Sequence, residues 1–166
     1  MTRIISSFHS PVGIILIEVN GEMITSLIFE EEKTVTPPEE IFDDSNILIK
    51  NCEQQLTAYF NGTRREFDLP LQQNGTVFQQ KIWTALQQIP YAKTISYLEL
   101  SKRTGDIKAI RAAGTTNGKN QLSIVVPCHR VIGSNGDLTG YSGGLWRKRW
   151  LLEHERKFAY GVQTLF

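Results

Sequence analysis

The stretch ISYLELSKRTGDIKAIRAAG, residues 95–114, predicts two short helices joined by a tight turn. Ser96 is followed three residues later by Glu99, which is the pattern of a capping box at the start of a helix. Gly105 is a strong stop signal and predicts the end of that helix. Asp106, directly after it, is a residue type that caps the start of a following helix.

The second helix of the pair is expected over Lys108 to Ala113, with Gly114 ending it. It has two cationic side chains, Lys108 and Arg111. Two short helices joined by a glycine turn fit a helix-turn-helix, in which the second helix contacts DNA. An ordinary packed helix pair has the same pattern, so this stretch alone does not establish DNA binding.

Three short runs of β-branched and aliphatic residues open the chain: Ile4–Phe8, Ile14–Val19 and Met23–Phe29. Residues 10–13, Ser-Pro-Val-Gly, separate the first two runs, and Asn20-Gly21 separates the second two. Asn-Gly is the strongest two-residue hairpin signal, because a type I′ turn needs a positive φ at both central positions. The pattern predicts a small N-terminal antiparallel sheet of three strands.

One helix is expected after these strands. The acidic, proline-containing residues 30–40 are expected to form a solvated loop. Ser45 then caps a helix that Gly62 ends, and its apolar stripe places Cys52 in the core. Residues 69–75 are expected to be a linker. The apolar stripe consists of Leu48, Ile49, Cys52, Leu56, Tyr59 and Phe60.

The length of the chain and the distribution of its charges indicate how many domains it has. The 166 residues, 40% hydrophobic and 21% charged, suffice for one compact domain or two small ones. Residues 1–79 have five basic and twelve acidic side chains, a net charge of −7, whereas residues 80–166 have thirteen and five, a net +8. This asymmetry indicates one acidic module and one that faces an anion such as nucleic acid. We expect an α+β fold with domains over 1–74 and 75–166, the second mostly helical and beginning with an amphipathic helix over 78–89.

The cysteines and the apolar runs indicate the compartment. Cys52 and Cys128 cannot form a disulfide framework, which favours a reducing environment. The apolar run Ile14–Val19 is too short for a membrane span or the core of a signal peptide. The His and Cys residues lack the paired spacing of a structural zinc site. We therefore expect a cytoplasmic protein with no metal, no other cofactor and no membrane contact.

The segment with the most reactive side chains reads IVVPCHRVIG, residues 124–133. Its first three residues predict a buried extended run that Pro127 ends, so Cys128 lies where the chain leaves a rigid core. A thiolate is the nucleophilic form of cysteine, and His129 and Arg130 are neighbours that favour it. Free cysteines are also often buried and inert, and consecutive side chains of a strand point to opposite faces. Contact between Cys128 and His129 would need an irregular backbone or a bridging water.

Further motifs surround Pro127–Arg130 at specific spacing. They are Asn135-Gly136, Tyr141–Leu145 (YSGGL) and Trp150–Glu155 (WLLEHE), and, earlier in the chain, Phe78, Ile95–Tyr97 and Ala109–Ala112. Together they resemble the O6-alkylguanine-DNA alkyltransferases, the methylated-DNA–protein-cysteine methyltransferase family. The resemblance covers essentially the whole second half. It implies a ribonuclease-H-like first domain, which the predicted strands and helix suit.

The resemblance implies a nucleophile, a base and an orienting group. Cys128 resembles the acceptor thiolate that attacks the alkyl carbon on guanine O6. His129 resembles the base that acts through a water, and Glu155 the carboxylate that orients the imidazole. Tyr97 resembles the hydroxyl donor to the flipped guanine. Asn120 resembles the side chain that holds the turn between the helix-turn-helix and the reactive segment.

The resemblance also implies how DNA is bound. Arg111 resembles the arginine that enters the base stack in place of the extruded nucleotide. Many bacterial relatives have alanine where Ser142 stands, so the range of alkyl groups accepted is open. The guanine pocket is expected to include Tyr141, Ser142, Gly143 and Val131. Other DNA contacts are expected from Ser96, Lys108, Ala112, Thr116 and Asn117.

The tryptophans and the basic run of residues 146–150 are expected to have structural roles rather than roles in the site. Trp146 and Trp150, four residues apart, predict core packing on a helix. The basic run Arg147–Arg149 predicts a solvated face that adds to the positive charge of this half.

The expected activity is direct, irreversible transfer of an alkyl group to Cys128 from O6-alkylguanine, and from O4-alkylthymine, in double-stranded DNA after base flipping. Each chain is expected to act once, as a monomer, and to associate with the nucleoid when bound to DNA. Two alternatives remain. One is a helix-turn-helix protein that senses damaged or shaped DNA without chemistry. The other is a cysteine hydrolase that uses Cys128, His129 and Glu155.

Overall fold

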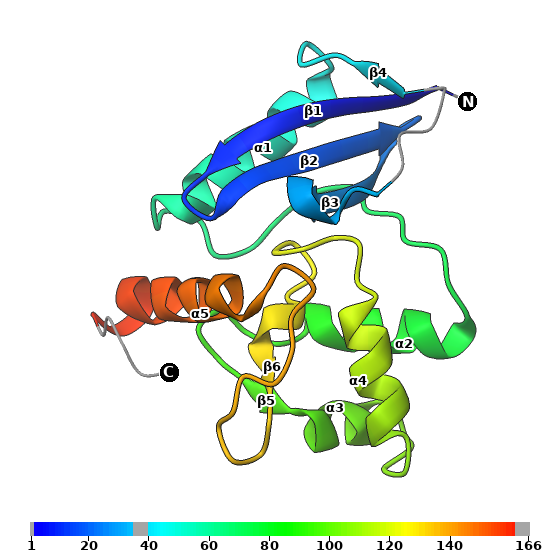
Figure 1. Cartoon of the computed structure of the whole chain (residues 1–166), viewed down its shortest axis with the longest axis vertical. Coiled ribbons are helices and arrows are strands. Elements are labelled where there is room, and N and C mark those ends of the chain that lie inside the picture. Colours follow the sequence, from blue (N-terminus) through cyan, green and yellow to red (C-terminus); the bar gives the residue numbers. More distant parts are fainter. Residues whose placement is uncertain (1, 35–39, 162–166) are drawn as a thin grey trace. The chain divides into compact units, whose positions relative to one another are not determined.

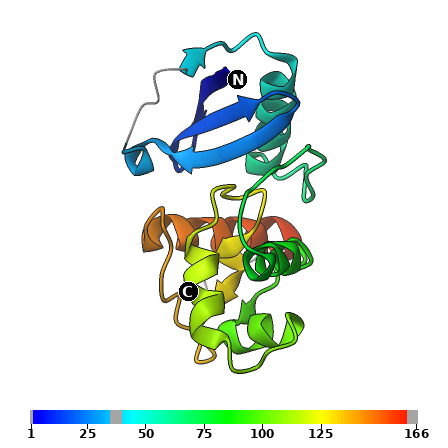
Figure 2. The same ribbon diagram turned by 90° about the vertical axis from the view of Figure 1, so that its right-hand side faces the viewer.

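The computed structural model describes residues 2–34 and 40–161. The chain forms two compact units, Met1–Gln73 and Asn74–Phe166, which Figures 1 and 2 show from two directions. The first unit holds a sheet covered by one helix, and the second is mostly helical. The predicted α+β fold class is confirmed. Within the described part of the chain, no helix is long and apolar enough to cross a membrane.

The first unit is built on the predicted meander. Strands β1 (Arg3–Ser10), β2 (Gly13–Asn20) and β3 (Met23–Phe29) pair antiparallel with their neighbours in sequence. Asn20 pairs with Met23, so the central residues of the hairpin between β2 and β3 are Gly21 and Glu22. Gly21 has φ of +64° and Glu22 has no positive φ, which is the φ pattern of a type II′ turn rather than of the expected type I′ turn. The three-stranded prediction is correct for these residues.

A fourth strand, β4 (Glu40–Phe42), extends the sheet beyond the prediction. It pairs parallel with β1, so the described strand order is β3-β2-β1-β4. The expectation of a loop over 30–40 is therefore wrong at its C-terminal end. It is also wrong at its start, because Glu30–Glu32 form a 3₁₀ turn, η1. Residues 35–39 of that expected loop lie outside the described residues.

Helix α1 (Ile47–Phe60) packs on one face of this sheet, against β1 and β2 (Figure 1). Asn46 caps it by accepting hydrogen bonds from two backbone N–H groups of the first turn. The prediction of Ser45 as the cap is wrong by one residue, because Ser45 hydrogen bonds to Asp43 instead. Cys52 is fully buried in the core, where burial raises the pKa of its thiol to about 12.

The expected linker over 69–75 is partly ordered on the sheet. The backbone N–H of Ile24 donates to the carbonyl of Pro70, and the backbone N–H of Gln72 donates to the Ile24 carbonyl at 2.9 Å. Leu71 therefore forms an isolated parallel bridge to β3. This segment belongs to the first unit until Gln73.

The second unit begins with α2 (Val77–Gln87), which Thr76 and Gln79 cap reciprocally. After a short strand, β5 (Ile95–Ser96), comes α3 (Tyr97–Arg103). The Ser96 hydroxyl accepts from the Glu99 backbone N–H at 3.0 Å, as predicted. The other half of the predicted capping box is absent among these residues, because the Glu99 carboxylate pairs with Arg103.

Helix α4 (Ile110–Gly118) starts later and runs further than predicted. Asp106 does not cap it but accepts from the Lys108 backbone N–H in the preceding turn. Gly114 lies within the helix rather than ending it. A Cβ at this position would lie 3.5 Å from Cδ1 of Tyr97, so the helices α3 and α4 approach closely here.

The reactive segment is irregular. The predicted extended run over 124–126 is buried but turns: Ile124 has φ of +72°, and the Val126 N–H donates to the Leu122 carbonyl. A 3₁₀ turn, η2 (Cys128–Arg130), and a short strand, β6 (Val131–Ile132), follow. Strand β6 pairs parallel with β5. The long helix α5 (Leu145–Tyr160) contacts η2 and completes the unit.

Candidate functional site

Cys128 is the first residue of η2 and is nearly fully buried. Its backbone N–H donates to the Val126 carbonyl at 2.8 Å, which tightens the turn that presents the thiol. Its own carbonyl accepts from Nδ2 of Asn117 at 3.3 Å. The thiol therefore sits on a backbone that is held on both sides.

Asn120 holds the preceding turn. Its Nδ2 donates to the Val126 carbonyl at 2.8 Å, and its Oδ1 accepts from the Leu122 backbone N–H at 3.1 Å. The side chain thus joins the end of α4 to the residues just before Cys128. An irregular buried backbone has few partners of its own, and a side-chain amide satisfies it.

A buried ionic cluster lies beside the thiol, between η2 and α5. Nε2 of His129 is 2.7 Å from Oε2 of Glu155. The Arg130 guanidinium donates to both carboxylate oxygens, at 2.9 and 3.1 Å, and to the Ile89 carbonyl. The Ala92 backbone N–H also donates to Glu155, at 3.1 Å. Three charged or polar side chains with almost no exposure thereby pair with one another and with two backbone groups.

The electrostatics of this cluster fix the imidazole. Burial alone would raise the pKa of Glu155. His129 and the Arg130 guanidinium lower it by more than burial raises it, so the carboxyl group is ionised. Burial also lowers the pKa of His129 overall, although Glu155 opposes this shift. A neutral imidazole facing a carboxylate must carry its proton on Nε2. Nδ1 is then the unprotonated nitrogen, and it is buried with no hydrogen-bond partner among the described residues.

The role of Arg130 was not predicted beyond its being a neighbouring cation. Only the tertiary fold brings Glu155 and the Ile89 carbonyl to its guanidinium. A weak signal exists in the sequence, because an arginine inside an otherwise buried apolar segment needs a carboxylate partner.

The prediction of a solvated face over Arg147–Arg149 is wrong for its first two residues. Lys148 is fully buried, and its Nζ donates to the carbonyls of Val131, Leu138 and Gly140. Arg147 is also buried and donates to the Gly143 carbonyl at 3.0 Å. These cations satisfy the backbone of the glycine-rich loop, which has few side chains to do so.

The prediction of core packing is also wrong for Trp146. Trp146 is 55% exposed, and the Arg147 guanidinium lies 4.6 Å from its ring centroid. Trp150 is half-buried and stacks on His154 at 4.8 Å. Helix α5 instead turns its charged residues Lys148 and Glu155 inward.

Of the residues predicted to form the guanine pocket, Val131 contacts Lys148 through its carbonyl. Val131 and Gly143 are buried, Tyr141 is half-buried and Ser142 is exposed. The Tyr97 hydroxyl is 2.7 Å from the Thr139 hydroxyl. The Tyr97 ring centroid is 5.9 Å from the Lys148 ammonium, which in turn acts electrostatically on Cys128. The structure thus links α3, the pocket loop over 133–144 and η2 through one buried cation.

Some of the residues predicted to contact DNA are exposed and others are buried. Lys108, Arg111 and Ala112 are exposed on the turn before α4 and on its first turn. Thr116 and Asn117 are buried, so the structure does not support DNA contacts by their side chains. Asn117 bonds to Cys128, and the Thr116 carbonyl accepts from Nε1 of Trp83. The Ser96 hydroxyl is half-buried and is used as the cap of α3.

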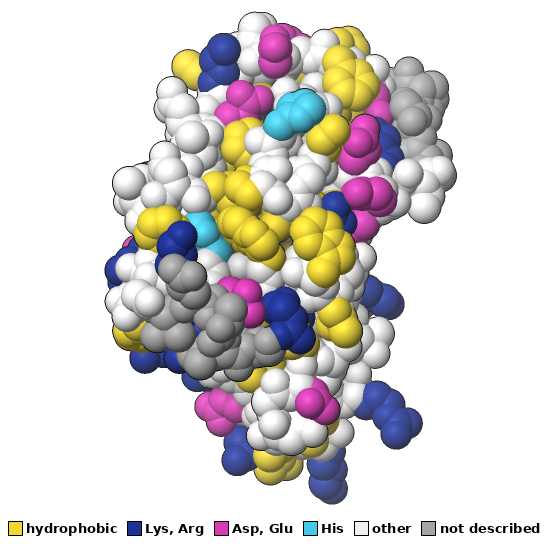
Figure 3. Space-filling model, turned by 60° about the vertical axis from the view of Figure 1, so that its left-hand side comes forward, with side chains coloured by type: hydrophobic (Ala, Val, Ile, Leu, Met, Phe, Trp, Pro, Cys, Tyr) yellow, Lys and Arg dark blue, Asp and Glu magenta, His cyan; other side chains and the backbone are white. Residues whose placement is uncertain are grey.

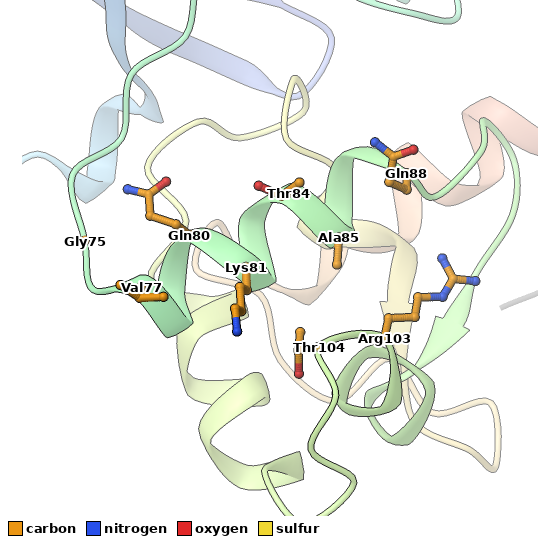
Figure 4. Close-up of a pocket in the computed structure, with 9 residues that line it drawn as sticks. All are labelled: Gly75, Val77, Gln80, Lys81, Thr84, Ala85, Gln88, Arg103 and Thr104. Carbon is orange, nitrogen blue, oxygen red and sulfur yellow. The ribbon is translucent and has the colours of Figure 1, made fainter.

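One hollow of the second unit is lined by none of the predicted site residues. A hollow of about 700 Å³ lies between α2 and the end of α3 (Figure 4). Lys81 and Ala85 lie on one side of α2 there, and Arg103 and Thr104 come from the end of α3. On the face that Figure 3 shows, Lys and Arg side chains lie at several separate places on this unit. Residues 2–34 and 40–161 include no group of three or more His, Cys, Asp or Glu suited to a metal ion.

The fold and the site define a class of protein. A buried cysteine stands beside a histidine whose proton is fixed on Nε2, and the same unit presents exposed cations on a helix-turn-helix. The comparison with known proteins agrees. Residues 77–157 match the DNA binding domain of 6-O-methylguanine DNA methyltransferase, and residues 4–73 match its ribonuclease-like domain.

Relatives cover nearly the whole chain. The methylated-DNA–protein-cysteine methyltransferase of Mycobacterium tuberculosis is 44% identical over 160 residues, 96% of each chain. The constitutive enzyme of that name from Bacillus subtilis is 43% identical over 152 residues, 89% of this chain and 92% of its own. A crystal structure of Mycobacterium tuberculosis OGT in complex with DNA superposes with a TM-score of 0.88 at 41% identity, covering 93% and 94% of the two chains. The chain belongs to the O6-methylguanine DNA methyltransferase family.

Proposed function

We propose that Cys128 is the acceptor in the repair of alkylated DNA by direct transfer that this chain carries out. Its thiolate sulfur attacks the alkyl carbon on guanine O6, a C–S bond forms and the C–O6 bond breaks. The electron pair of that bond goes to guanine, which takes up a proton. The observation that carries the proposal is the buried thiol on η2 next to a histidine of fixed tautomer.

His129 acts as the base that receives the Cys128 proton through a water. Its Nδ1 is the unprotonated nitrogen and has no competing partner among the described residues. Glu155 fixes the tautomer and stabilises the imidazolium that forms, and Arg130 holds Glu155 in place. This pairing favours transfer over the binding-only alternative, in which a prepared nucleophile has no role.

The remaining site residues act on the guanine. Tyr97 donates its hydroxyl proton toward the leaving base, since guanine leaves poorly as an anion. The pocket is formed by Tyr141, Ser142, Gly143 and Val131. Asn120 holds the turn that carries the thiol. The cysteine hydrolase alternative gives no role to Tyr97, to Lys108 before α4 or to Arg111 on its first turn.

DNA is the partner, bound by residues 75–166, whereas residues 1–74 form the ribonuclease-H-like domain. A base in a duplex is out of reach of a buried thiol, so the nucleotide is flipped at a cost of a few kcal/mol. Arg111, exposed on the first turn of α4, fills the space that it leaves. The phosphate-facing surface includes Lys108 and Ala112. The protein acts as a monomer in the cytoplasm, at the nucleoid when bound, and O4-alkylthymine is a second substrate.

The test is mass spectrometry after titration with a duplex that contains O6-methylguanine. We expect a gain of one methyl on Cys128 and a plateau at one event per chain, because a thioether is a stable product. Cys128→Ser should bind the duplex and gain no mass. Multiple turnovers, or methyl on another residue, would overturn the proposal. Turnover of an activated ester would favour the hydrolase instead.

A further inference from the structure

Lys148 is a fully buried lysine in the middle of the candidate site. Its ammonium donates to the carbonyls of Val131 and Leu138, each at 2.6 Å, and of Gly140 at 3.0 Å. An ammonium has three N–H donors, and all three are used. Among these hydrogen bonds there is no carboxylate, so backbone carbonyls accept all three.

These three carbonyls belong to segments that the proposed reaction must hold together. Val131 follows the reactive turn in β6, and Leu138 and Gly140 lie in the pocket loop over 133–144. Thr139, between them, has φ of +66°, a strained conformation for a β-branched residue. Its hydroxyl is the one that pairs with the Tyr97 hydroxyl. The ammonium therefore joins this strained loop to the strand that follows the reactive turn.

We propose that Lys148 is a positioning residue for alkyl transfer, whose charged form ties the pocket loop to the reactive segment and keeps Tyr97 and Cys128 in register. The inference rests on the proposed function. It assigns no contact between Lys148 and the substrate. A neutral amine has one donor fewer, so loss of the proton releases one of the three carbonyls and loosens the loop.

The surroundings of Lys148 make this tie sensitive to pH. Burial lowers the pKa of Lys148 to about 8, although Cys128 raises it in part. The titratable groups facing the ammonium are Cys128 and His129 from η2 and Tyr97 from α3. A thiolate forms more readily as pH rises, so the nucleophile alone predicts a rising rate. Loss of the Lys148 proton predicts instead that the transfer rate falls above about pH 8.

The free energy of unfolding should rise with pH while the transfer rate falls. A loss of positioning can therefore be told apart from unfolding. Because the pKa of Lys148 is lower in the folded state, the unfolded chain binds more protons between about pH 8 and 10.5. The contribution of this group to the free energy of unfolding therefore rises over that range and is lost as pH falls through 8. A transfer rate that declines with pH while stability is unchanged or rises is therefore what the loss of these Lys148 hydrogen bonds predicts.

The experiment measures single-turnover transfer from free O6-methylguanine base between about pH 6 and 9.5, a range below the ordinary tyrosine pKa of about 10. The wild-type rate should decline with a midpoint near pH 8, while urea unfolding shows no loss of stability. Lys148→Met should be slower by about ten- to a hundredfold at neutral pH and lack the decline. Lys148→Arg stays charged throughout, so its decline should also be absent.

Arg149→Met is the matched control, an exposed cation one residue along the same helix. On free base it should behave as wild type. If Lys148→Met does not fold, the wild-type and Lys148→Arg profiles decide. A wild-type rate without a decline near pH 8, or the same decline in Lys148→Arg, would overturn the inference. Failure of the wild type to methylate Cys128 from a duplex would instead overturn the proposed function.

Discussion

Glu155 is a buried carboxylate that is surrounded by donors. His129, the Arg130 guanidinium and the Ala92 backbone N–H all point at its two oxygens. An ion pair of this kind gains little over an apolar core, but removing one member leaves the others buried and uncompensated. Glu155 therefore matters to both the imidazole and the stability of the second unit.

We predict that Glu155→Gln lowers the free energy of unfolding by about 3–5 kcal/mol at neutral pH, because an amide N–H₂ then faces the Arg130 guanidinium. The folded pKa of Glu155 is depressed from the ordinary 4.5, so its stabilisation exists above that pH and is lost on acidification. The difference between wild type and variant should narrow from pH 7 toward pH 3, as urea unfolding would measure. A difference independent of pH would contradict this.

Single residues differ in how far the sequence alone predicts them. The proposed roles of Cys128, His129 and Glu155 follow from the family resemblance, and the structure places Glu155 against His129, the neighbour of Cys128 in η2. The buried Lys148 could not be predicted, because a lysine in a basic run is usually solvated and its carbonyl partners come from a loop without regular structure. The burial of Thr116 and Asn117 could not be predicted for the same reason, since burial depends on tertiary packing.

At the scale of elements, two glycines of the helix pair have opposite requirements. Gly114 lies inside α4, where an added Cβ would make an ordinary contact with the Tyr97 ring at 3.5 Å. Gly105 lies between α3 and α4 with φ of +91°, and a Cβ added there would have no described atom within 4 Å. Space therefore permits alanine at both positions, and backbone conformation distinguishes them.

We predict that Gly114→Ala stabilises the chain by about 0.5–1 kcal/mol, because alanine loses less backbone entropy in a helix. Gly105→Ala should destabilise it by about 1–2 kcal/mol, since its φ is unfavourable for any residue with a Cβ. Urea midpoints for both variants measure this. Shifts of the same sign would show that space rather than φ decides.

The elements themselves were predicted wherever periodicity was long and punctuated. Strands β1 to β3 and helices α1 and α2 follow from apolar alternation, helical spacing and glycine stops. The boundaries of α4 were missed because Gly114 is tolerated inside a helix that packs closely on α3. Strand β4 was missed because three residues beside an acidic stretch carry no period. Residues 124–126 look like a strand, but a buried turn has the same apolar composition.

At the scale of the whole molecule, charge is distributed unevenly between the two halves of the chain. Residues 1–79 have a net charge of −7 and residues 80–166 a net +8. Each protein cation that neutralises a phosphate releases counterions, so duplex affinity should fall steeply with salt. The two modules should then contribute very differently to that dependence, the acidic one adding nothing or opposing it.

We predict that log affinity for an unmodified duplex falls linearly with log salt between about 50 and 200 mM, with a slope of about −0.9 per phosphate contact. Lys108→Gln, on the exposed turn before α4, should reduce the size of that slope by about 0.9. Lys50→Gln is the matched control, because Lys50 is an exposed lysine on α1 of the acidic unit and should leave the slope unchanged. Fluorescence anisotropy on the full chain measures all three proteins. Equal slope changes in both variants would mean that the first unit shares the phosphate surface, and a flat wild-type response would mean that phosphate contacts do not drive binding.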